Sequence, residues 1–443
     1  MTGRVTVAPR QRPRVIVVGT GFAGYHCLRK LERRLPADAA ELIAVNPTDY
    51  MLYLPLLPEV AGGILDPRRV AISLRAKLPR TRLVLGNATG VDPAKRTCTV
   101  VDVEGRTHVL TWDRLVLTAG SVTRLLSIPG VAEHAKGFRS VADGIYLRDH
   151  LLRQLELAEE THDPAERAAR TTFVVVGAGY TGSEFAAQGA LLTSIATRRR
   201  GGDERDIRWV LVDIAPRVLP NLSQRLSGPA RRVLAARGID VRLGTGVSEV
   251  TATCVRLSDG SEIPTRTVVW CVGVRPDPLV DGLDLSTREG RLVVDEYLAV
   301  PHCEGMFSAG DVAAVPDVYH PGAITPMTAQ HAQRQGKTAA INVAASLGHG
   351  QPRRYRHRDL GFVVDLAGNQ AVADPLHVPI TGWPAKAVTR GYHLIALPAN
   401  RMRVLADWLT DLTTRRQLVH FGLVPETGVC LADADRPPRV ERA

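Results

Sequence analysis

The sequence has few cysteines, and their spacing excludes the usual zinc and disulfide classes. Only six occur in 443 residues, and no two of them form a C-x-x-C pair. We therefore expect neither a disulfide framework nor a metal site, and this pattern fits a reducing compartment. The cysteines are Cys27, Cys98, Cys254, Cys271, Cys303 and Cys430.

Long hydrophobic runs are lacking too. No uninterrupted apolar segment is long enough to span a bilayer, and the first residues lack the apolar core of a signal peptide. Residues 1–13 are polar and basic, which predicts a flexible arm. The overall composition is that of a globular chain, and the length is sufficient for two or three domains with large cores.

A glycine fingerprint occurs twice. In each copy an apolar run enters the loop G-x-G-x-x-G, and a helix-compatible segment leaves it. The first glycine of such a loop permits a tight turn, the second lets the backbone approach a pyrophosphate, and the third lets the helix pack closely on the strand. The pyrophosphate lies on the free N–H groups at the start of the helix. The glycines are Gly19, Gly21 and Gly24 in one copy and Gly177, Gly179 and Gly182 in the other.

The pair of fingerprints predicts two bound dinucleotides. The alternative is two ordinary glycine-rich turns, an interpretation that suits one copy better than both. The net charge of +11 also favours an anionic partner. Two dinucleotides account for part of this charge, and an anionic membrane surface would account for more. We expect no nucleic acid, because the sequence shows no aromatic and basic recognition module.

The strand after each fingerprint ends at the position where this fold binds a ribose. In the second copy the position holds Asp213, whose carboxylate suits the 2′-hydroxyl of NADH and repels the 2′-phosphate of NADPH. Arg217 lies nearby and keeps NADPH open as an alternative. In the first copy the position holds Asn46, which can bind a ribose without a charge.

Each half of the chain then repeats a second pattern, in which short strands end at a turn of small residues. These turns contain Gly120 and Gly273, so the sequence indicates an internal duplication. Further along, an apolar strand leads through Gly310 to Asp311, whose carboxylate can reach a sugar-like chain. A helix N-cap is the alternative role for this aspartate.

The layout resembles the two-dinucleotide-binding flavoproteins of the pyridine-nucleotide:disulfide-reductase type. Within them it is most similar to the type II, non-proton-pumping NADH:quinone dehydrogenases, over about residues 13–420. The resemblance implies an α/β fold with two Rossmann-like domains, for FAD and NADH, and a C-terminal α+β domain that ends in an amphipathic helix. The matching motifs are GTGFAG at 19–24, PLLPEVAGG at 55–63, TAG at 118–120, GAGYTGSE at 177–184, WCVGVRP at 270–276, SAGDVA at 308–313 and AQHAQRQG at 329–336.

The resemblance also implies roles for single residues. The first glycine set and Asp311 would bind FAD, and the second set and Asp213 would bind NADH. Three residues become catalytic candidates: Glu184 matches a glutamate near the nicotinamide, and Gln330 and Gln335 match a segment that lines the flavin and the quinone. The cofactor-binding candidates are Gly19, Gly21, Gly24, Asn46, Gly120, Gly177, Gly179, Gly182, Asp213, Gly273, Gly310, Asp311, Ala329 and Gln330.

Some residues depart from the family pattern. Arg334 replaces the first of two paired glutamines, and Asn46 replaces an acid, at a cost of about 1.5–3 kcal/mol for one charged hydrogen bond. Disulfide reductases of this superfamily carry a cysteine pair after the first fingerprint, whereas Cys27 stands alone. Sulfide:quinone oxidoreductases need cysteines beside the flavin, and none stands at a suitable place. We expect the cysteines to be core residues.

Residues 401–421 predict a basic amphipathic helix. Leu405, Trp408, Leu409 and Leu412 recur at helical spacing, with arginines on both sides. Such a helix can lie in a membrane interface. Packing on the protein's own body or on a second subunit is the alternative. The resemblance favours the membrane, because that family attaches peripherally through its C-terminal region.

We predict an FAD-dependent oxidoreductase that takes hydride from NADH and passes two electrons to a membrane quinone. It would act peripherally on the cytoplasmic side of the cell membrane, or otherwise in the cytoplasm, with a homodimer as a further expected assembly. The alternatives are a soluble NAD(P)H-dependent reductase of another acceptor and a non-enzymatic, NADH-sensing flavoprotein. The predicted division is an arm at 1–13, FAD-binding parts at 14–140 and 301–350, an NAD(P)H-binding domain at 141–300, a membrane or dimer region at 351–425 and a tail at 426–443.

Overall fold

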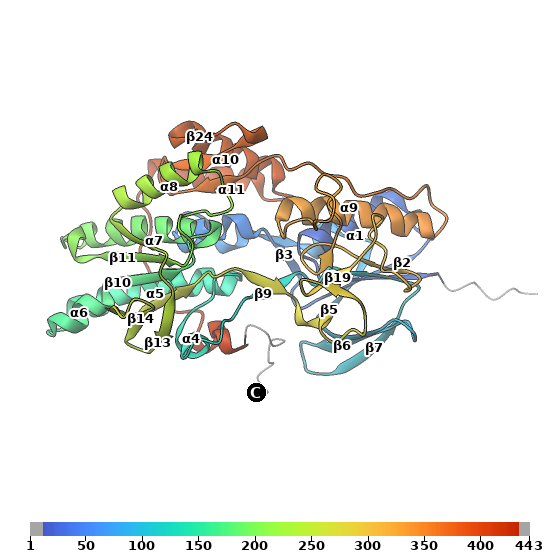
Figure 1. Ribbon diagram of the computed structural model, residues 1–443, viewed down its shortest axis with the longest axis horizontal. Helices are drawn as coiled ribbons and strands as arrows, with labels where there is room; N and C mark the ends of the chain where they lie inside the picture. Colours follow the sequence, from blue (N-terminus) through green and yellow to red (C-terminus); the bar gives the residue numbers. More distant parts are fainter. Residues whose placement is uncertain (1–11, 434–443) are drawn as a thin grey trace, which may run out of the picture.

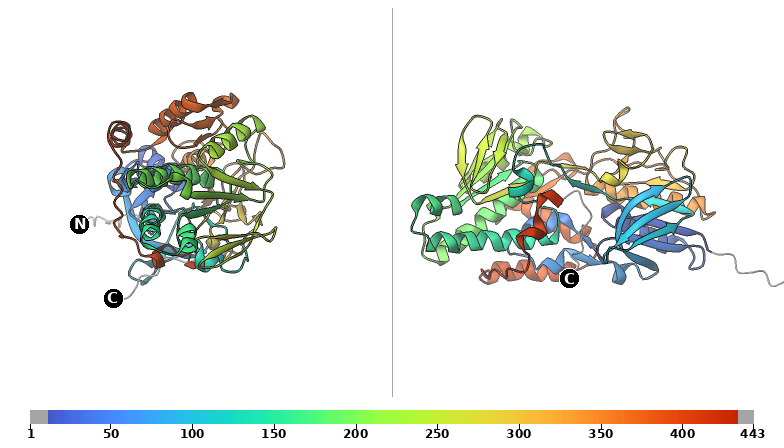
Figure 2. Two further views of the ribbon diagram at one scale, coloured as in Figure 1. Left: turned by 90° about the vertical axis from the view of Figure 1, so that its left-hand side faces the viewer. Right: turned by 90° about the horizontal axis from the view of Figure 1, so that it is seen from below.

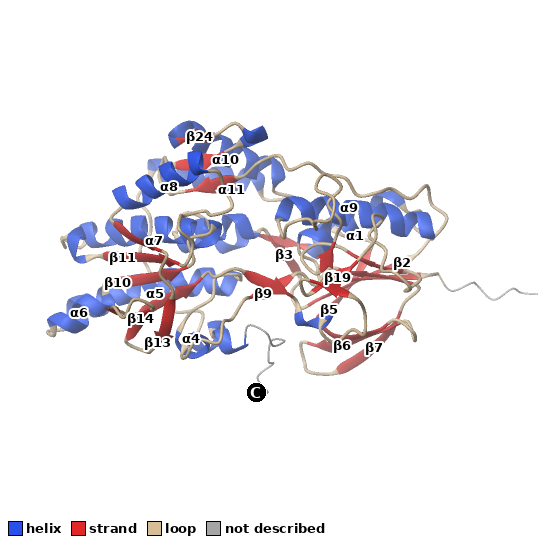
Figure 3. Cartoon of the chain, in the orientation of Figure 1, coloured by secondary structure: helices blue, strands red, loops and turns tan. Residues whose placement is uncertain are grey.

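The computed structural model describes residues 12–433. Two sheet-based bodies lie side by side, and a smaller C-terminal layer lies above the left-hand one in the view of Figure 1. Both bodies contain helices as well as strands (Figure 3). Of the predicted arm, only Arg12 and Pro13 are described, and the predicted tail is described as far as Asp433.

The first sheet is built around β1 (Arg14–Val18), of which all residues but Arg14 are buried. It has seven strands in the order β20-β8-β1-β2-β5-β6-β7, of which β6 and β7 form an antiparallel ribbon. The last strand in sequence, β20, pairs with β8, so the chain returns to this sheet after building the second one. The strands are β1 (Arg14–Val18), β2 (Glu41–Asn46), β5 (Thr81–Asp92), β6 (Thr97–Asp102), β7 (Thr107–Thr111), β8 (Arg114–Leu117) and β20 (Met306–Ser308).

Two helices pack together beside this sheet because a glycine lets them approach. These are α1 (Phe22–Arg34) and α9 (Ala329–Ser346), which lie next to one another in Figure 1. A Cβ atom at Gly336 of α9 would lie 2.0 Å from the carbonyl oxygen of Ala23 in α1. The amino ends of both helices are therefore held at the same edge of the sheet.

The second sheet repeats this design from one continuous stretch of chain. Its four strands are all parallel, in the order β12-β11-β10-β16. The helix after β10, α7, packs closely on the sheet because it has a glycine at the contact. A Cβ atom at Gly189 would lie 2.2 Å from the Trp209 ring. The elements are α5 (Val141–Glu160), β10 (Thr172–Val176), α7 (Tyr180–Arg199), β11 (Arg208–Asp213), α8 (Gln224–Ala236), β12 (Ile239–Leu243) and β16 (Thr267–Trp270).

A short two-stranded sheet joins the two bodies. The small-residue turns of the two halves lead into β9 and β17, and these strands pair with each other in antiparallel register. Figure 2 shows the two bodies from below, with β5–β7 at one end and the green helices at the other. The joining and smaller elements are β3 (Tyr50–Leu52), α2 (Leu57–Ala61), β4 (Ala71–Ser73), α3 (Leu74–Lys77), β9 (Ser121–Thr123), α4 (Val131–His134), α6 (Pro164–Arg170), β13 (Val247–Val250), β14 (Cys254–Leu257), β15 (Glu262–Pro264), β17 (Val274–Pro276), β18 (Thr287–Arg288), β19 (Arg291–Val293) and β21 (Ala313–Ala314).

The C-terminal layer consists of a three-stranded antiparallel sheet and two helices. The predicted helix over 401–421 ends earlier than expected, because the backbone becomes extended at Thr414. No helix in residues 12–433 is long and apolar enough to cross a membrane. The elements are β22 (Val363–Asp365), β23 (Ala371–Ala373), β24 (Ile380–Thr381), α10 (Gly382–Ala396) and α11 (Arg401–Thr413).

The structure corrects the single apolar face predicted for this last helix. Trp408 is only 2% exposed and lies against the protein, whereas Leu409 and Leu412 are 54% and 64% exposed. Trp408 turns inward because its indole N–H donates to the buried carboxylate of Glu59. The helix therefore has a docked face and a separate exposed apolar face.

Candidate functional site

The first glycine loop connects β1 to α1 and leaves one position open. A Cβ at Gly19 would lie 2.4 Å from the Thr118 carbonyl oxygen, and one at Gly24 would lie 1.8 Å from that of Gly19. A Cβ at Gly21 meets nothing within 4 Å. The outer two glycines are thus required by packing, whereas the backbone at Gly21 faces open space at the start of α1.

The second glycine loop, between β10 and α7, has the same geometry. A Cβ at Gly177 would lie 2.4 Å from the Cys271 carbonyl oxygen, and one at Gly182 would lie 1.8 Å from that of Gly177. Gly179 again has nothing within 4 Å. Each loop therefore leaves a cradle next to the free N–H groups of a helix, which is the shape that a pyrophosphate needs.

The residues at the ends of β2 and β11 brace these loops. Asn46 accepts a hydrogen bond from the backbone N–H of Thr20 at 2.9 Å, and Asp213 accepts one from Ala178 at 2.5 Å. The Arg217 guanidinium donates to the Pro220 carbonyl oxygen. The two predicted ribose positions are therefore equivalent in the two halves.

The two small-residue turns meet where the bodies join. Gly120 and Gly273 both have φ near +84°, a conformation that favours glycine, and a Cβ at either position would meet nothing. The N–H of Asp277 donates to the Gly120 carbonyl oxygen at 3.1 Å. The edges of the two sheets that carry the glycine loops are thereby connected.

Asp311 lies at this junction, beside the turn that follows β8. The Ser121 hydroxyl donates to Asp311 at 2.6 Å, and Arg139 donates to the Ser121 carbonyl oxygen at 2.8 Å. Burial lowers the pKa of the Arg139 guanidinium. The carboxylate is thus held in place by a neutral hydroxyl beside a half-buried cation.

The start of α9 reaches the same place. Gln335 is 1% exposed and both ends of its amide have protein partners: it accepts from the N–H of Gly310 at 2.8 Å and donates to the Thr325 hydroxyl at 2.9 Å. Gln330, which directly follows Ala329 at the helix start, donates to the Gly361 carbonyl oxygen at 2.7 Å. Gln335 therefore braces the loop that carries Asp311, whereas Gln330 lies toward the C-terminal layer.

Arg334 and His357 both contact Gln330. Arg334 donates to its backbone carbonyl oxygen at 3.2 Å, and a ring nitrogen of His357 lies 3.4 Å from its amide oxygen. Burial and the nearby Arg334 charge lower the pKa of His357 to about 4. This histidine is therefore neutral at physiological pH.

Glu184 lies two residues beyond Gly182 in α7 and faces the C-terminal layer. Its carboxylate accepts a hydrogen bond from the backbone N–H of Asp365 at 2.9 Å. Burial raises the pKa of Glu184 well above the usual range. Nearby, Tyr180 stacks on Phe362 at 5.4 Å between ring centroids. A carboxyl with a raised pKa thus lies beside the second glycine loop.

The comparisons with known proteins agree with this geometry. Residues 13–336 match the pyridine nucleotide-disulphide oxidoreductase family. The chain is 33% identical to the type II NADH:quinone oxidoreductase Ndh of Mycobacterium tuberculosis, covering 93% of this chain and 90% of that protein. It is 28% identical to the mitochondrial internal alternative NAD(P)H-ubiquinone oxidoreductase A1 of Solanum tuberosum, covering 92% and 88%.

The fold is also that of a solved structure, NDH2 from Plasmodium falciparum in complex with NADH. The TM-score is 0.84 at 17% identity, and the match covers 92% of this chain and all of that one. The chain belongs to the type II NADH:quinone oxidoreductase family. The predicted family and fold class, and the prediction of an oxidoreductase, are thereby confirmed.

The family's flavin and nicotinamide fit the residues present. The two open cradles offer backbone N–H donors to two pyrophosphates. In residues 12–433 all six cysteines are free, and no group of histidine, cysteine and acidic side chains could hold a metal ion.

A group of buried ionisable residues behind Glu184 could not be found from the sequence. Asp365, Lys386 and Glu59 come from three different elements, and Lys386 pairs with Asp365. The only sequence signal was the family motif that contains Glu59. This member of the family thus has a charged layer between its second glycine loop and its C-terminal helices.

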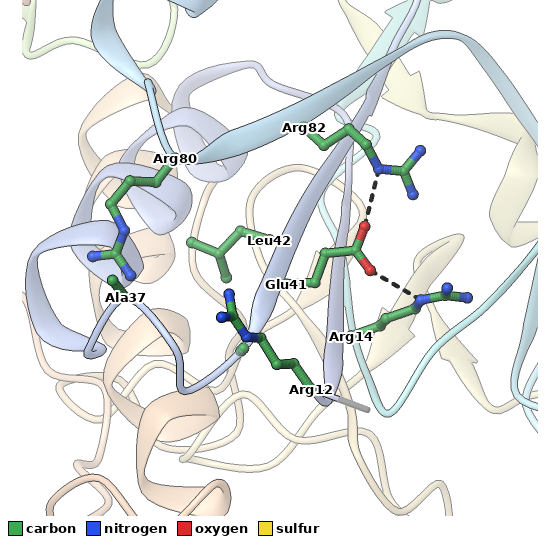
Figure 4. Close-up of a pocket in the computed structure, with 8 residues that line it drawn as sticks. Arg12, Arg14, Ala37, Glu41, Leu42, Arg80 and Arg82 are labelled. Carbon is green, nitrogen blue, oxygen red and sulfur yellow. Dashed lines mark hydrogen bonds and ion pairs between the residues drawn. The ribbon is translucent and has the colours of Figure 1, made fainter. Parts of the chain in front are cut away.

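A surface pocket lies at the opposite edge of the first sheet (Figure 4). In it, Glu41 pairs with Arg14 and Arg82, each at 3.0 Å. Arg14 and Glu41 begin β1 and β2, whereas the glycine loop follows the other end of β1. The pocket is therefore separate from the cofactor cradles. It is lined by Arg12, Arg14, Ala37, Ala40, Glu41, Leu42, Arg80 and Arg82.

Proposed function

We propose that this chain transfers hydride from NADH to FAD and then two electrons to a quinone. The observation that carries the proposal is the pair of equivalent glycine cradles at the joined edges of the two sheets. The names of the family relatives, NADH:quinone and NAD(P)H-ubiquinone oxidoreductases, support the substrates. The overall reaction consumes NADH, a proton and a quinone, and yields NAD⁺ and a quinol.

We assign FAD to the first cradle, where the chain supplies donors from Gly21 and the start of α1. Asp311 would accept from a flavin side-chain hydroxyl, and Gln335 would keep the Gly310 loop in position for it. Bound FAD supplies the redox chemistry, since it accepts a hydride and releases electrons. The other proposed contacts are Gly19, Gly24, Asn46, Gly120, Gly310, Ala329 and Gln330.

We assign NADH to the second cradle. The Asp213 carboxylate favours the free 2′-hydroxyl of NADH over a 2′-phosphate. Glu184 would stabilise the positive charge that the nicotinamide gains as hydride leaves. The other proposed contacts are Gly177, Gly179, Gly182 and Gly273. The proposed domains are 14–140 with 301–350 for FAD and 141–300 for NADH.

Gln330 is our proposed residue on the quinone side. Its amide lies at the start of α9, between the first cradle and the segment around Gly361. An amide in this place can donate to a quinone carbonyl oxygen. Arg334, bonded to the Gln330 backbone, sets the position of that turn.

We propose that the C-terminal layer contacts an anionic membrane surface, from the cytoplasmic side. Its helices expose apolar side chains that the rest of the described chain leaves uncovered. Large exposed apolar groups next to arginines favour a lipid interface. A homodimer through the same face is the alternative outcome. The exposed residues of α10 and α11, with fractions from 54% to 77%, are Trp383, Ile395, Met402, Leu409 and Leu412.

The test is an anaerobic absorbance titration of the purified flavoprotein. NADH should bleach the flavin, and injection of a soluble quinone should restore its colour within seconds. Bleaching without recovery would identify a different acceptor or a sensor. Sedimentation with anionic vesicles, compared with neutral ones, separates membrane binding from dimerisation, which light scattering detects.

A further inference from the structure

Behind Glu184 lies a buried cluster of charged side chains that no part of the reaction above uses. Glu59 on α2 is 3% exposed, Asp365 on β22 is 7% exposed and Lys386 on α10 is 6% exposed. The Lys386 ammonium pairs with Asp365 and lies 3.9 Å from the carboxylate of Glu59. One cation therefore stands between two buried carboxylates from different elements.

The cluster is anchored on its far side by α11. The Trp408 indole N–H donates to the Glu59 oxygen that does not face Lys386. The Arg390 guanidinium lies over the Trp408 ring, 4.9 Å from its centroid. Trp408 thus fixes Glu59 with the only hydrogen-bond donor that its side chain has.

The near side of the cluster ends at Glu184. The backbone N–H of Asp365 donates to Glu184 at 2.9 Å, and the Asp365 side chain accepts from Gln188 of the same helix at 3.4 Å. Moving Asp365 would therefore move the donor that Glu184 depends on. An unbroken series of contacts runs from α11 through Glu59, Lys386 and Asp365 to α7.

The charges in this cluster do not balance. Of the three carboxyl groups, at Glu59, Glu184 and Asp365, only the first and last lie within 4 Å of the Lys386 ammonium among the described contacts. Burial and the Asp365 charge raise the pKa of Glu59 to about 7, and the Glu59 charge in turn helps to raise the pKa of Glu184. The other ionisable groups that act on the cluster are Tyr180, Arg237, Arg390 and His393.

We propose that Glu59 is a positioning residue for Glu184: it fixes Lys386 between itself and Asp365, and Trp408 on α11 fixes Glu59. The proposal rests on the proposed role of Glu184 beside the nicotinamide. The proposal gives the docked face of α11 a role besides packing, since that face carries Trp408. The opposite face of the same helix exposes Leu409 and Leu412.

The test compares the pH dependence of flavin reduction in matched variants of the holoenzyme. The rate of bleaching by NADH should rise with pH as Glu184 ionises. Glu59→Gln removes a negative charge next to Glu184. The pH at which the reduction rate rises should therefore fall by about one unit, so that at a given pH on the rising limb the rate is up to about tenfold higher. Trp408→Phe should move it in the same direction, because Glu59 without its donor is protonated more readily.

Asp407→Asn is the control. Asp407 neighbours Trp408 and docks the same helix through Arg69 at 2.8 Å, outside the cluster. It should leave the pH profile in place. The proposal is overturned by a flat wild-type profile, by a Glu59→Gln profile that superimposes on the wild type, or by an equal shift in Asp407→Asn and Trp408→Phe.

A second readout needs no NADH. A buried carboxyl with a raised pKa stabilises the fold at low pH, and this stabilisation is lost as pH rises through the folded-state value. The melting temperature of Glu59→Gln should therefore fall less than that of the wild type between about pH 5 and 8. An equal fall would count against the cluster. If NADH failed to bleach the wild type, the proposed function would fail, and this readout would still decide whether Glu59 is charged in the fold.

Discussion

Asn46 and Asp213 make the same hydrogen bond in the two halves of the molecule. Each accepts from the backbone N–H that follows the first glycine of its loop, at Thr20 and Ala178 respectively. Both side chains therefore fix a glycine loop before any ribose is bound. This bond needs an acceptor but no charge, which accounts for an asparagine at a position where the family pattern has an acid.

Restoring the acid should weaken the first site rather than improve it. The Asn46 amide nitrogen donates to the carbonyl oxygen of Thr48 at 2.9 Å and to its hydroxyl at 3.0 Å. In Asn46→Asp a carboxylate oxygen would face that carbonyl oxygen. We expect a loss of about 1–3 kcal/mol in the free energy of unfolding, measured in urea, and a lower flavin content. Tighter FAD retention in Asn46→Asp would show that the ribose contact outweighs the loop contact.

Asp213 should act mainly on NADH binding. Asp213→Asn keeps an acceptor for Ala178 and removes the charge, whereas Asp213→Ala also removes the loop bond. We expect Asp213→Asn to raise the KM for NADH by about tenfold with little change in kcat. The ratio of kcat/KM for NADH to that for NADPH should fall as well. Asp213→Ala should in addition lower the melting temperature. A fall in kcat at unchanged KM would place Asp213 away from the ribose.

Gly21 and Gly24 provide a matched pair of alanine substitutions. A methyl group at Gly24 would collide with the Gly19 carbonyl oxygen, whereas one at Gly21 meets no protein atom. We expect Gly24→Ala to lose several kcal/mol of stability, and Gly21→Ala to keep the apoprotein's melting temperature while binding FAD at least tenfold more weakly. Equal flavin affinity in Gly21→Ala would remove the pyrophosphate from this loop. Gly179→Ala and Gly182→Ala repeat the comparison for NADH.

Gln335 and Gln330 should also differ, with Gln335 acting mainly on stability and Gln330 mainly on binding. Gln335 is buried with both ends of its amide bonded, so Gln335→Leu leaves the Gly310 N–H without an acceptor. We expect a loss of about 1–3 kcal/mol in stability, together with loss of flavin. Gln330→Leu should lower flavin content less than Gln335→Leu does, because the first cradle keeps its other contacts, and it should raise the KM for quinone. Ferricyanide reduction, which needs no quinone site, is the control for both variants.

The parts of the fold that follow local rules were predictable. The two glycine loops, the strands that enter them and the turns at Gly120 and Gly273 lie where the sequence indicates, because glycine spacing and apolar runs act over a few residues. The pairing of β9 with β17 was not predictable, although both turns were recognised. It depends on how two separate sheets meet, and no local pattern encodes that.

The C-terminal region shows a second limit of the sequence. Helical spacing places Trp408 and Leu412 in one stripe, yet one is buried and the other exposed. The deciding partner, Glu59, stands about 350 residues earlier in the chain. Long-range polar contacts of this kind decide which apolar side chain turns inward, and amphipathic periodicity does not report them.

The return of β20 to the first sheet has a consequence for synthesis on the ribosome. The second sheet draws its four strands from one uninterrupted stretch, residues 172–270, and can close as soon as that stretch has emerged. The first sheet lacks its edge strand, and the aspartate that follows it, until Met306–Asp311 has been made. Because domains fold as units during translation, the half that starts first finishes last. We therefore expect flavin to bind a chain whose other half is already folded.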